Sequence, residues 1–364
     1  MEYILISQWE GGKTALGRTR RVLFAILALV ISAASAFAFN PQTPPAERNA
    51  ILISWDGAQR EHVKECLSRN ELPNLAALIK EGAMVDIDVI GHQTDTKAGH
   101  TQMLTGYDPD ITGVYSNSKY RPIPVGYTIF ERLNQQFGKE NIATIMLTGK
   151  SHHIGSLGPG EVAPSDKRKA RRTARNTVAE DEETAKLKPR QRAKAQAAKV
   201  AETNKEGEPW YKVKANFTVW DGDIARPATQ VGPKCLEYID KYGKGRFFAF
   251  YHFSDPDHAG HAHGENSKEY NDALIECDAW LGKIVEKLKS AGLYDKTMIF
   301  VTADHGFDEG KTSHKNAPNV FLATNNPRVR KNGDQRDIVP TILVEMGADI
   351  TKITPKLPGK SLTE

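Results

Sequence analysis

Acidic and imidazole side chains recur directly after apolar runs in this 364-residue chain, which is the pattern of a metal site at a sheet edge. A single aspartate after a strand is usually a helix cap, but the sequence repeats the arrangement after three runs. The residues concerned are Asp56, Asp257, His261, Asp304, His305 and, one short loop later, His314. Carboxylate oxygens together with imidazole nitrogens suit zinc, whereas calcium prefers shells made of oxygen alone. We therefore expect these side chains to bind divalent metal, most naturally Zn2+.

A hydroxyl group near this set is the candidate nucleophile. The segment Thr96–Gly106 reads as a polar loop that enters a short helix. A hydroxyl at a helix N-terminus lies among unpaired N–H groups and at the positive end of the helix dipole, which would stabilise an alkoxide. Beside a metal ion such a hydroxyl becomes a competent nucleophile. The sequence therefore indicates Thr96 as a catalytic residue.

Strands and helices that alternate along the chain would position these residues. Apolar runs bounded by turn or polar residues predict buried strands at 50–54, 143–147, 247–253 and 298–302. Helical patterns cover 73–81 and 268–290. The second of these helices would bury one face, made of Leu274, Cys277, Leu281, Ile284, Val285 and Leu288. Alternation of this kind predicts an α/β domain with a largely parallel sheet.

Composition and charge exclude several classes of protein. With 39% hydrophobic and 26% charged residues, the chain is neither disordered, nor collagen-like, nor a small disulfide scaffold. The net charge of +4 is concentrated at the N-terminus and in residues 166–200, so the remaining chain is mildly acidic. A basic DNA-binding domain is excluded, and we expect no specific nucleic-acid partner. Three cysteines without a C-x-x-C pair make a thiolate zinc site implausible.

Residues 1–38 resemble a secretory signal peptide. Three arginines precede an uncharged run that begins at Val22, and small residues near Ala36 would suit cleavage. An uncleaved membrane anchor is the alternative, because the run is at the lower length limit for a span. We expect a periplasmic or secreted protein whose single catalytic domain covers residues 39–364.

A basic, low-complexity insertion is expected at about 164–208. It is rich in Lys, Arg, Ala and Glu and nearly lacks large apolar residues. Such a segment cannot bury enough apolar surface to offset its ordering entropy. It is either a solvated insertion or a basic arm that contacts an anionic surface through residues 166–200.

Four separated motifs resemble the alkaline phosphatase superfamily, and within it the type I phosphodiesterase/nucleotide pyrophosphatase family, from about residue 49 onward. Asp56-Gly57 ends an I-x-x-D-G motif, and the nucleophile motif T-x-P-N-H-x4-T-G is matched except that Ala98-Gly99 replaces Pro-Asn. A phosphate-contacting asparagine of the family corresponds to Asn117. The remaining matches are Pro256, Asp257, Gly260, His261 and Gly264 in P-D-x-x-G-H-x-x-G, Asp304-His305-Gly306 in D-H-G, and the closing segments 337–341 and 359–362.

The resemblance implies a three-layer α/β/α sandwich with two metal sites. One site would consist of Asp257, His261 and His314, for which Asp255 and His263 are rival ligands. The other site would consist of Asp56, Thr96, Asp304 and His305.

The resemblance also implies a mechanism on a small phosphoester substrate. Thr96 would attack phosphorus in line and become covalently phosphorylated, between two divalent ions about 4 Å apart. Asn117 and the backbone N–H next to Thr96 would donate hydrogen bonds to the non-bridging oxygens.

The segment Gly149-Lys150-Ser151-His152 bears on which ester is cleaved. It is similar to the G-K-x-H motif of sulfatases, in which the lysine and histidine bind the anionic group. Lys150 and His152 would favour the dianion of a monoester, and an ordinary loop lysine is the alternative. A sulfatase, a phosphotransferase and a non-catalytic binding protein remain rivals to a phosphodiesterase or phosphomonoesterase. Thr96 argues against the sulfatase, because sulfatases convert Cys or Ser at the nucleophile position.

Overall fold

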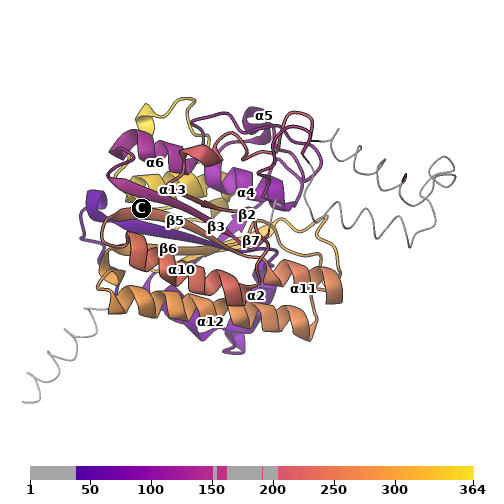
Figure 1. Ribbon diagram of the computed structural model, residues 1–364. Coiled ribbons are helices and arrows are strands. Elements are labelled where there is room, and N and C mark those ends of the chain that lie inside the picture. Colours follow the sequence, from indigo (N-terminus) through magenta and orange to yellow (C-terminus); the bar gives the residue numbers. More distant parts are fainter. Residues whose placement is uncertain (1–37, 151–153, 162–190, 192–203) are drawn as a thin grey trace, which may run out of the picture. The chain divides into compact units, whose positions relative to one another are not determined.

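Eight strands form one sheet in the computed structural model, which describes residues 38–150, 154–161, 191 and 204–364 (Figure 1). They are β1 (Asn49–Trp55), β2 (Ala83–Asp88), β3 (Ile142–Thr148), β4 (Val219–Asp221), β5 (Arg246–Phe253), β6 (Thr297–Thr302), β7 (Asn319–Thr324) and β8 (Gly333–Asp334). Their spatial order is β4-β3-β5-β1-β6-β7-β2-β8. Strand β7 runs antiparallel to both neighbours, and the other pairings are parallel. The predicted, largely parallel sheet is confirmed.

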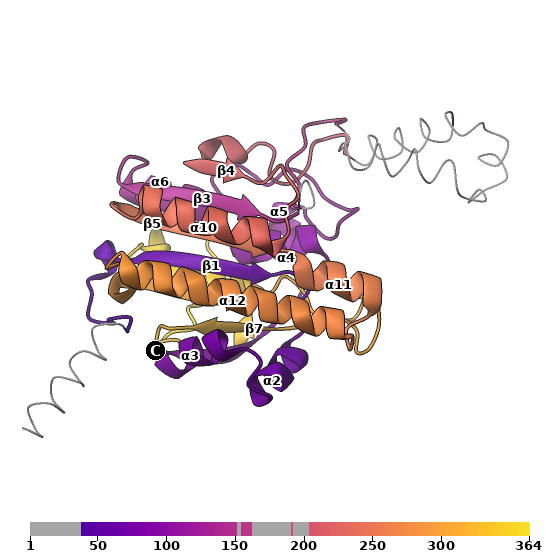
Figure 2. The same ribbon diagram turned by 60° about the horizontal axis from the view of Figure 1, so that its bottom comes forward.

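Helices cover both faces of this sheet. They are α2 (Arg60–Ser68), α3 (Pro73–Glu81), α4 (Thr96–Thr105), α5 (Pro109–Thr112), α6 (Ile129–Phe137), α10 (Ala228–Tyr242), α11 (Asp255–His263), α12 (Lys268–Ser290) and α13 (Ile338–Glu345). Figures 1 and 2 show α10, α12 and α3 on one face, and α4, α6 and α13 on the other. The α/β/α sandwich expected from the sequence is therefore confirmed.

The register of the central strands brings their carboxyl ends to one level. Ser54 of β1 pairs with His252 of β5 and with Thr302 of β6, and Thr148 of β3 also pairs with His252. The chain segments that follow these four strands therefore leave the sheet at the same edge. Three of them carry the aspartates expected to bind metal, and the fourth carries Lys150.

The long helix α12 has the bounds predicted from its periodicity. Ser267 caps it by accepting a hydrogen bond from the Tyr270 N–H. Leu274, Leu281 and other members of its apolar face are buried against the core, while Val285 is partly buried. Helix α12 also packs against α11, which carries the candidate ligands Asp257 and His261.

Several predictions concern residues outside or at the margin of the described chain. The signal peptide falls on residues 1–38, of which only residue 38 is described, and nothing is described of most of the insertion. Residues 204–208 are described: the Asn204 side chain donates to the Gly158 carbonyl, and the Glu208 N–H donates to the Leu157 carbonyl. Within the described ranges, no helix is both long enough and apolar enough to span a membrane.

The three cysteines, Cys66, Cys235 and Cys277, are buried and carry free thiols. None of them lies in either group of candidate metal ligands. Their burial is typical of cysteines that pack as small apolar residues.

A buried ion pair connects helix α2 with two loops at the edge of the sheet where the candidate metal ligands lie. His62 Nδ1 lies 2.7 Å from Glu265 Oε1, and Glu265 Oε2 accepts the Gly310 N–H at 3.0 Å. Burial opposes the charged imidazole, but the neighbouring Cys66 and Glu265 outweigh it and raise the pKa of His62 to about 10. The pair therefore fastens the loop that contains Gly310 and His314 to α2.

Replacing His62 tests this ion pair through its pH dependence. Because the pKa is raised on folding, the stabilisation is complete below about pH 6.5 and is lost as the pH approaches 10. We expect His62→Gln to lower the free energy of unfolding by about 3 kcal/mol at pH 6, the usual effect of breaking a buried pair, and by much less at pH 10. Denaturant unfolding of both proteins at the two pH values measures the difference. The exposed His263→Gln is the control, and an equal loss at both pH values would contradict the account.

Candidate active site

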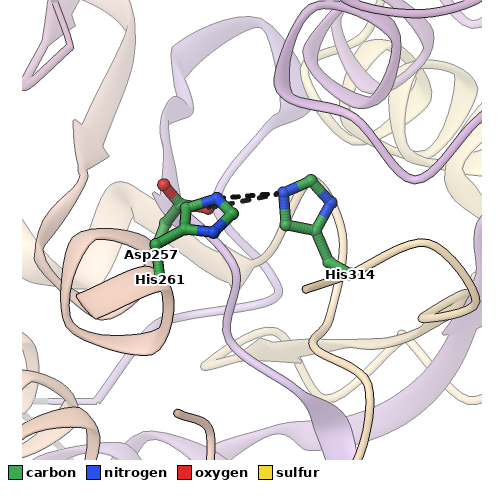
Figure 3. Close-up of side chains that lie close together, drawn as sticks. All are labelled: Asp257, His261 and His314. Atoms are coloured by element: carbon green, nitrogen blue, oxygen red, sulfur yellow. Dashed lines mark hydrogen bonds and ion pairs between the residues drawn. The ribbon is translucent and has the colours of Figure 1, made fainter. Parts of the chain in front are cut away.

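The first group of candidate ligands joins helix α11 to the loop between β6 and β7. Asp257 and His261 are one helical turn apart, and His314 approaches them from the loop (Figure 3). His261 Nε2 lies 3.4 Å from Asp257 Oδ1 and 3.1 Å from His314 Nε2. The structure thus brings together the three residues predicted for one metal site.

Backbone hydrogen bonds orient both imidazoles of this group toward a metal ion. His261 Nδ1 lies 2.9 Å from the Thr312 carbonyl, and His314 Nδ1 lies 2.5 Å from the Thr94 carbonyl. A carbonyl can only accept, so each Nδ1 carries a proton, and in the neutral rings each Nε2 presents a lone pair. Two such lone pairs 3.1 Å apart beside a carboxylate need a proton or a metal ion between them. The donor set therefore fits a divalent ion.

The second group lies at the ends of β1 and β6. Asp56, Asp304 and His305 are fully buried, and their candidate ligand atoms lie within 4.8 Å of one another. His305 Nδ1 donates to the Gly306 carbonyl at 2.9 Å, so its Nε2 faces the carboxylates, 3.4 Å from Asp304 Oδ2 and 3.7 Å from Asp56 Oδ1. Three of the four residues predicted for the other site are therefore also brought together, and the fourth is Thr96.

The buried atoms of these groups need a cation. Within the described chain, Asp56 Oδ1, Asp257 Oδ1, Asp304 Oδ2 and His305 Nε2 are buried without a hydrogen-bond partner. Burial and the nearby Asp56 charge raise the pKa of Asp304 to about 7. Leaving such acceptors unpaired is unfavourable, and metal coordination is one of the few ways to satisfy them.

The candidate nucleophile Thr96 is the first residue of α4 and is buried. Helix α4 approaches the end of β6 closely, which brings Thr96 near the second group of candidate ligands. A Cβ atom on Gly99 would lie 2.3 Å from the Asp304 carbonyl oxygen, so glycine is required at this contact. The family has asparagine here, and in this chain glycine brings the helix and the second ligand group together.

His100 ties the same helix to the sheet. Its Nδ1 donates to the Thr96 carbonyl at 2.8 Å and lies 3.3 Å from Asp304 Oδ2. Its Nε2 therefore accepts from the Ser54 hydroxyl at 3.0 Å. Burial lowers the pKa of His100 well below its usual value, so the ring is neutral. The motif histidine thus orients helix α4, which carries the candidate nucleophile.

Asn117 is held beside the N-terminus of α4. Its backbone N–H donates to Asp95 Oδ2 at 2.8 Å, and its side-chain Oδ1 accepts the Lys97 N–H at 2.9 Å. The backbone N–H next to Thr96, expected to contact phosphate, is therefore engaged in orienting Asn117. This arrangement leaves the Asn117 Nδ2 group as the donor available to an anion.

Lys150 lies between the two ligand groups. Its buried Nζ is 2.6 Å from Asp257 Oδ2, 2.8 Å from Asp56 Oδ2 and 3.3 Å from Thr96 Oγ1. Burial disfavours the charged forms of the lysine and of the two aspartates. The ion pairs between them nevertheless raise the pKa of Lys150 and hold the pKa values of Asp56 and Asp257 below their usual range. His152, predicted to act with Lys150, lies outside the described residues.

His252 is a site residue that the sequence analysis missed. Its Nδ1 accepts the Gly149 N–H at 3.2 Å, so its Nε2 carries the proton and donates to Asp56 Oδ2 at 2.7 Å. It therefore positions a candidate ligand and the loop that carries Lys150. The sequence signal for His252 is that it is a polar residue within the aromatic run of β5. It was missed because the pattern of that run predicts a core position.

The two rival ligands have other environments. Asp255 accepts the Ala228 N–H at the start of α10 through both carboxylate oxygens, at 2.9 and 3.0 Å. His263 is exposed at the end of α11. Neither belongs to the two groups of candidate ligands found in the described chain.

Solved structures with a similar arrangement of strands and helices identify the fold. A phosphonate monoester hydrolase from Silicibacter pomeroyi superposes with a TM-score of 0.52 at 15% identity, covering 86% of this chain and 76% of that chain. The TAB5 alkaline phosphatase superposes with a TM-score of 0.50 at 15% identity, covering 84% of this chain and 99% of that chain. At this identity the likeness shows the fold alone, which is alkaline-phosphatase-like.

Sequence comparison gives the family. The type I phosphodiesterase/nucleotide pyrophosphatase family matches residues 50–360. A bis(5'-adenosyl)-triphosphatase of Mus musculus is 23% identical over 312 residues, 84% of this chain and 56% of the relative. A 2,3-bisphosphoglycerate-independent phosphoglycerate mutase of Clostridium kluyveri is 34% identical over 122 residues, 30% of this chain and 22% of the relative.

The chain belongs to the type I phosphodiesterase/nucleotide pyrophosphatase family. The resemblance inferred from the motifs is therefore confirmed. The chain spans about half the length of the curated bis(5'-adenosyl)-triphosphatases that it matches.

The contact at Gly99 gives a test of the assembled site. The added methyl group of Gly99→Ala must push α4 away from Asp304, because the carbonyl it meets is backbone. A displacement of about 1 Å at a reacting group can reduce turnover about 100-fold, so we expect a loss of that size in kcat/KM for an aryl phosphoester. Gly245→Ala, whose new methyl group meets nothing closer than 3.9 Å, is the matched control. Unchanged kinetics in the folded Gly99→Ala protein would show that this contact does not position Thr96.

Proposed function

We propose that the protein is a two-metal phosphoester hydrolase that works outside the cytoplasm through a covalent phospho-threonine intermediate. The observation that carries the proposal is the pair of Asp/His groups whose unpaired ligand atoms flank a single buried cation, which itself contacts the Thr96 hydroxyl. Family membership supports phosphoester hydrolysis. The proposed location outside the cytoplasm depends on the N-terminal sequence.

Each metal ion would be held by one group of side chains. Asp257, His261 and His314 would hold one ion; Asp56, Asp304 and His305, together with Thr96, would hold the other. Zinc suits this mixture of carboxylate and imidazole ligands. When bound, the two ions would neutralise phosphate charge and make the Thr96 hydroxyl more acidic.

The residues of the chain then account for the two chemical steps. Thr96 Oγ1 loses its proton to solvent and attacks phosphorus, while the bond from phosphorus to the leaving-group oxygen breaks and that oxygen is protonated by solvent. Asn117 Nδ2 donates to a non-bridging oxygen throughout. A water molecule then attacks the phosphorus of phospho-Thr96, which releases phosphate or a phosphomonoester and restores the hydroxyl. Both steps depend on positioning and charge neutralisation, as in phosphoryl transfer generally.

The substrate is proposed to be a small phosphodiester or phosphomonoester. The name of the mouse relative, a bis(5'-adenosyl)-triphosphatase, favours nucleotide-like diesters. Lys150, close to Thr96, favours substrates with additional phosphate charge. The phosphoglycerate mutase relative supports one alternative, transfer of the phosphoryl group to an alcohol.

A substrate panel tests the proposal. The zinc-reconstituted protein is assayed with an aryl phosphate monoester, an aryl phosphodiester, a nucleotide and an aryl sulfate, and the kcat/KM values are compared. Phosphoester hydrolysis with negligible sulfate hydrolysis is the expected result. Sulfate hydrolysis restored by calcium alone would identify a sulfatase, and bound metal without any turnover would identify a binding protein.

Removal of the Thr96 hydroxyl tests the nucleophile. We expect Thr96→Ala to reduce kcat at least about 1,000-fold, because the attacking atom is lost, while the fold and most of the bound zinc are retained. Thr101→Ala, five residues further along the same helix, is the control and should retain activity. Rapid-quench experiments should trap a phosphorylated wild-type chain and no phosphorylated variant. Comparable turnover in Thr96→Ala would mean that another nucleophile attacks.

Lys150 tests the choice between monoester and diester. A charge-assisted hydrogen bond contributes about 1.5–3 kcal/mol, so Lys150→Ala at saturating zinc should slow monoester hydrolysis roughly 10- to 100-fold. Diester hydrolysis should fall much less, because a diester lacks the second negative charge. Equal losses with both substrates would show that Lys150 has a general structural role, and no loss with either would support a preference for diesters.

A further inference from the structure

Lys150 places a permanent positive charge where the two proposed metal sites meet. Its ammonium forms ion pairs with Asp257 of one group and Asp56 of the other, at 2.6 and 2.8 Å. The side chain is 4% exposed, so water cannot screen these contacts effectively. The lysine is thus a third cation in a centre already proposed to hold two.

In the carboxylates of Asp56 and Asp257, the two oxygen atoms have the same two kinds of neighbour. In each, Oδ2 faces Lys150, whereas Oδ1 lacks a hydrogen-bond partner in the described chain and lies near an imidazole Nε2. These distances are 3.4 Å from Asp257 Oδ1 to His261 and 3.7 Å from Asp56 Oδ1 to His305. Each carboxylate therefore offers one oxygen to a metal ion and the other to the ammonium. A metal ion on Oδ1 would share its carboxylate with Lys150.

Electrostatics determines the consequence of this sharing. Asp56, Asp257 and Asp304 supply three negative charges, and Lys150 neutralises one of them in the metal-free protein. Two divalent ions bring four positive charges, so with the ammonium in place the net charge of the centre, side chains and ions together, becomes +2. Like charges a few ångströms apart in a buried site repel strongly.

We propose that Lys150 is a built-in competitor of the metal ions: it stabilises the metal-free centre, weakens zinc binding, and is released from the carboxylates toward the substrate phosphate when the ions bind. Its 3.3 Å contact with Thr96 Oγ1 shows that the ammonium already lies at the nucleophile, beside the place that the phosphate must occupy. Metal loading and recognition of phosphate charge are thereby coupled through one side chain. This inference rests on the proposed metal centre.

Three full-length variants test the competition without relying on activity. Lys150→Met removes the charge but keeps most of the side-chain volume, and Lys150→Arg keeps the charge. Lys97→Met removes the other lysine near Thr96, whose ammonium pairs with Glu208 at 3.1 Å and not with the ligand carboxylates. Metal is removed by chelation, zinc affinity is measured by competition with a chromogenic chelator at pH 8, and thermal unfolding is followed with and without zinc.

The competition predicts opposite effects in the two states of the Lys150→Met protein. Without metal it should melt at a lower temperature than the wild type, because the carboxylates lose their cation. It should nevertheless bind zinc at least about 10-fold more tightly and gain more in melting temperature from zinc. Lys150→Arg and Lys97→Met should keep wild-type zinc affinity to within a few-fold. Equal or weaker zinc binding by Lys150→Met would overturn the inference.

Two further measurements keep the result interpretable. If metal-free Lys150→Met does not fold, the variant is purified with zinc and the ion is extracted with excess chelator. Slower extraction than from the wild type supports the competition, and equal or faster extraction overturns it. Failure of the wild type to hydrolyse any phosphoester while it binds zinc would contradict the proposed function and leave this inference standing.

Discussion

Mutual repulsion among three buried carboxylates is the constraint on which the arrangement of the candidate active site depends. Asp56, Asp257 and Asp304 meet at the carboxyl ends of parallel strands and are buried there. Burying such charges is strongly unfavourable unless cations and hydrogen bonds compensate. Lys150 and the Nε2–H group of His252 supply part of this compensation. The Nε2 lone pairs of the candidate ligands would contribute only through a bound metal ion.

The fold supplies the compensation through backbone contacts. Strand register aligns the ends of β1, β3, β5 and β6, so the segments after them converge without long excursions. Carbonyl groups fix the imidazole tautomers, and Gly99 allows α4 to approach close enough to set Thr96 beside the second group. The sheet therefore determines where most of the candidate ligands lie, while the loops contribute His314 and Lys150.

Sequence alone predicted the sheet and the groups of candidate ligands because motif spacing and apolar runs are local signals. The residues Asp257 and His261, for example, are separated by one helical turn whatever surrounds them. Other features depend on three-dimensional packing. His252 resembled a core residue of an aromatic strand, and the contact of Lys150 with both carboxylates depends on the pairing of β3 with β5. The antiparallel strand β7 was not predicted, because its short apolar run lies between loops.

Zinc-edge anomalous diffraction from crystals of the zinc-loaded protein tests the central claim most directly. The account predicts two anomalous peaks, one bounded by Asp257, His261 and His314 and the other by Asp56, Asp304 and His305, with Thr96 Oγ1 next to the second. A single peak, or zinc bound away from these six side chains, would contradict it.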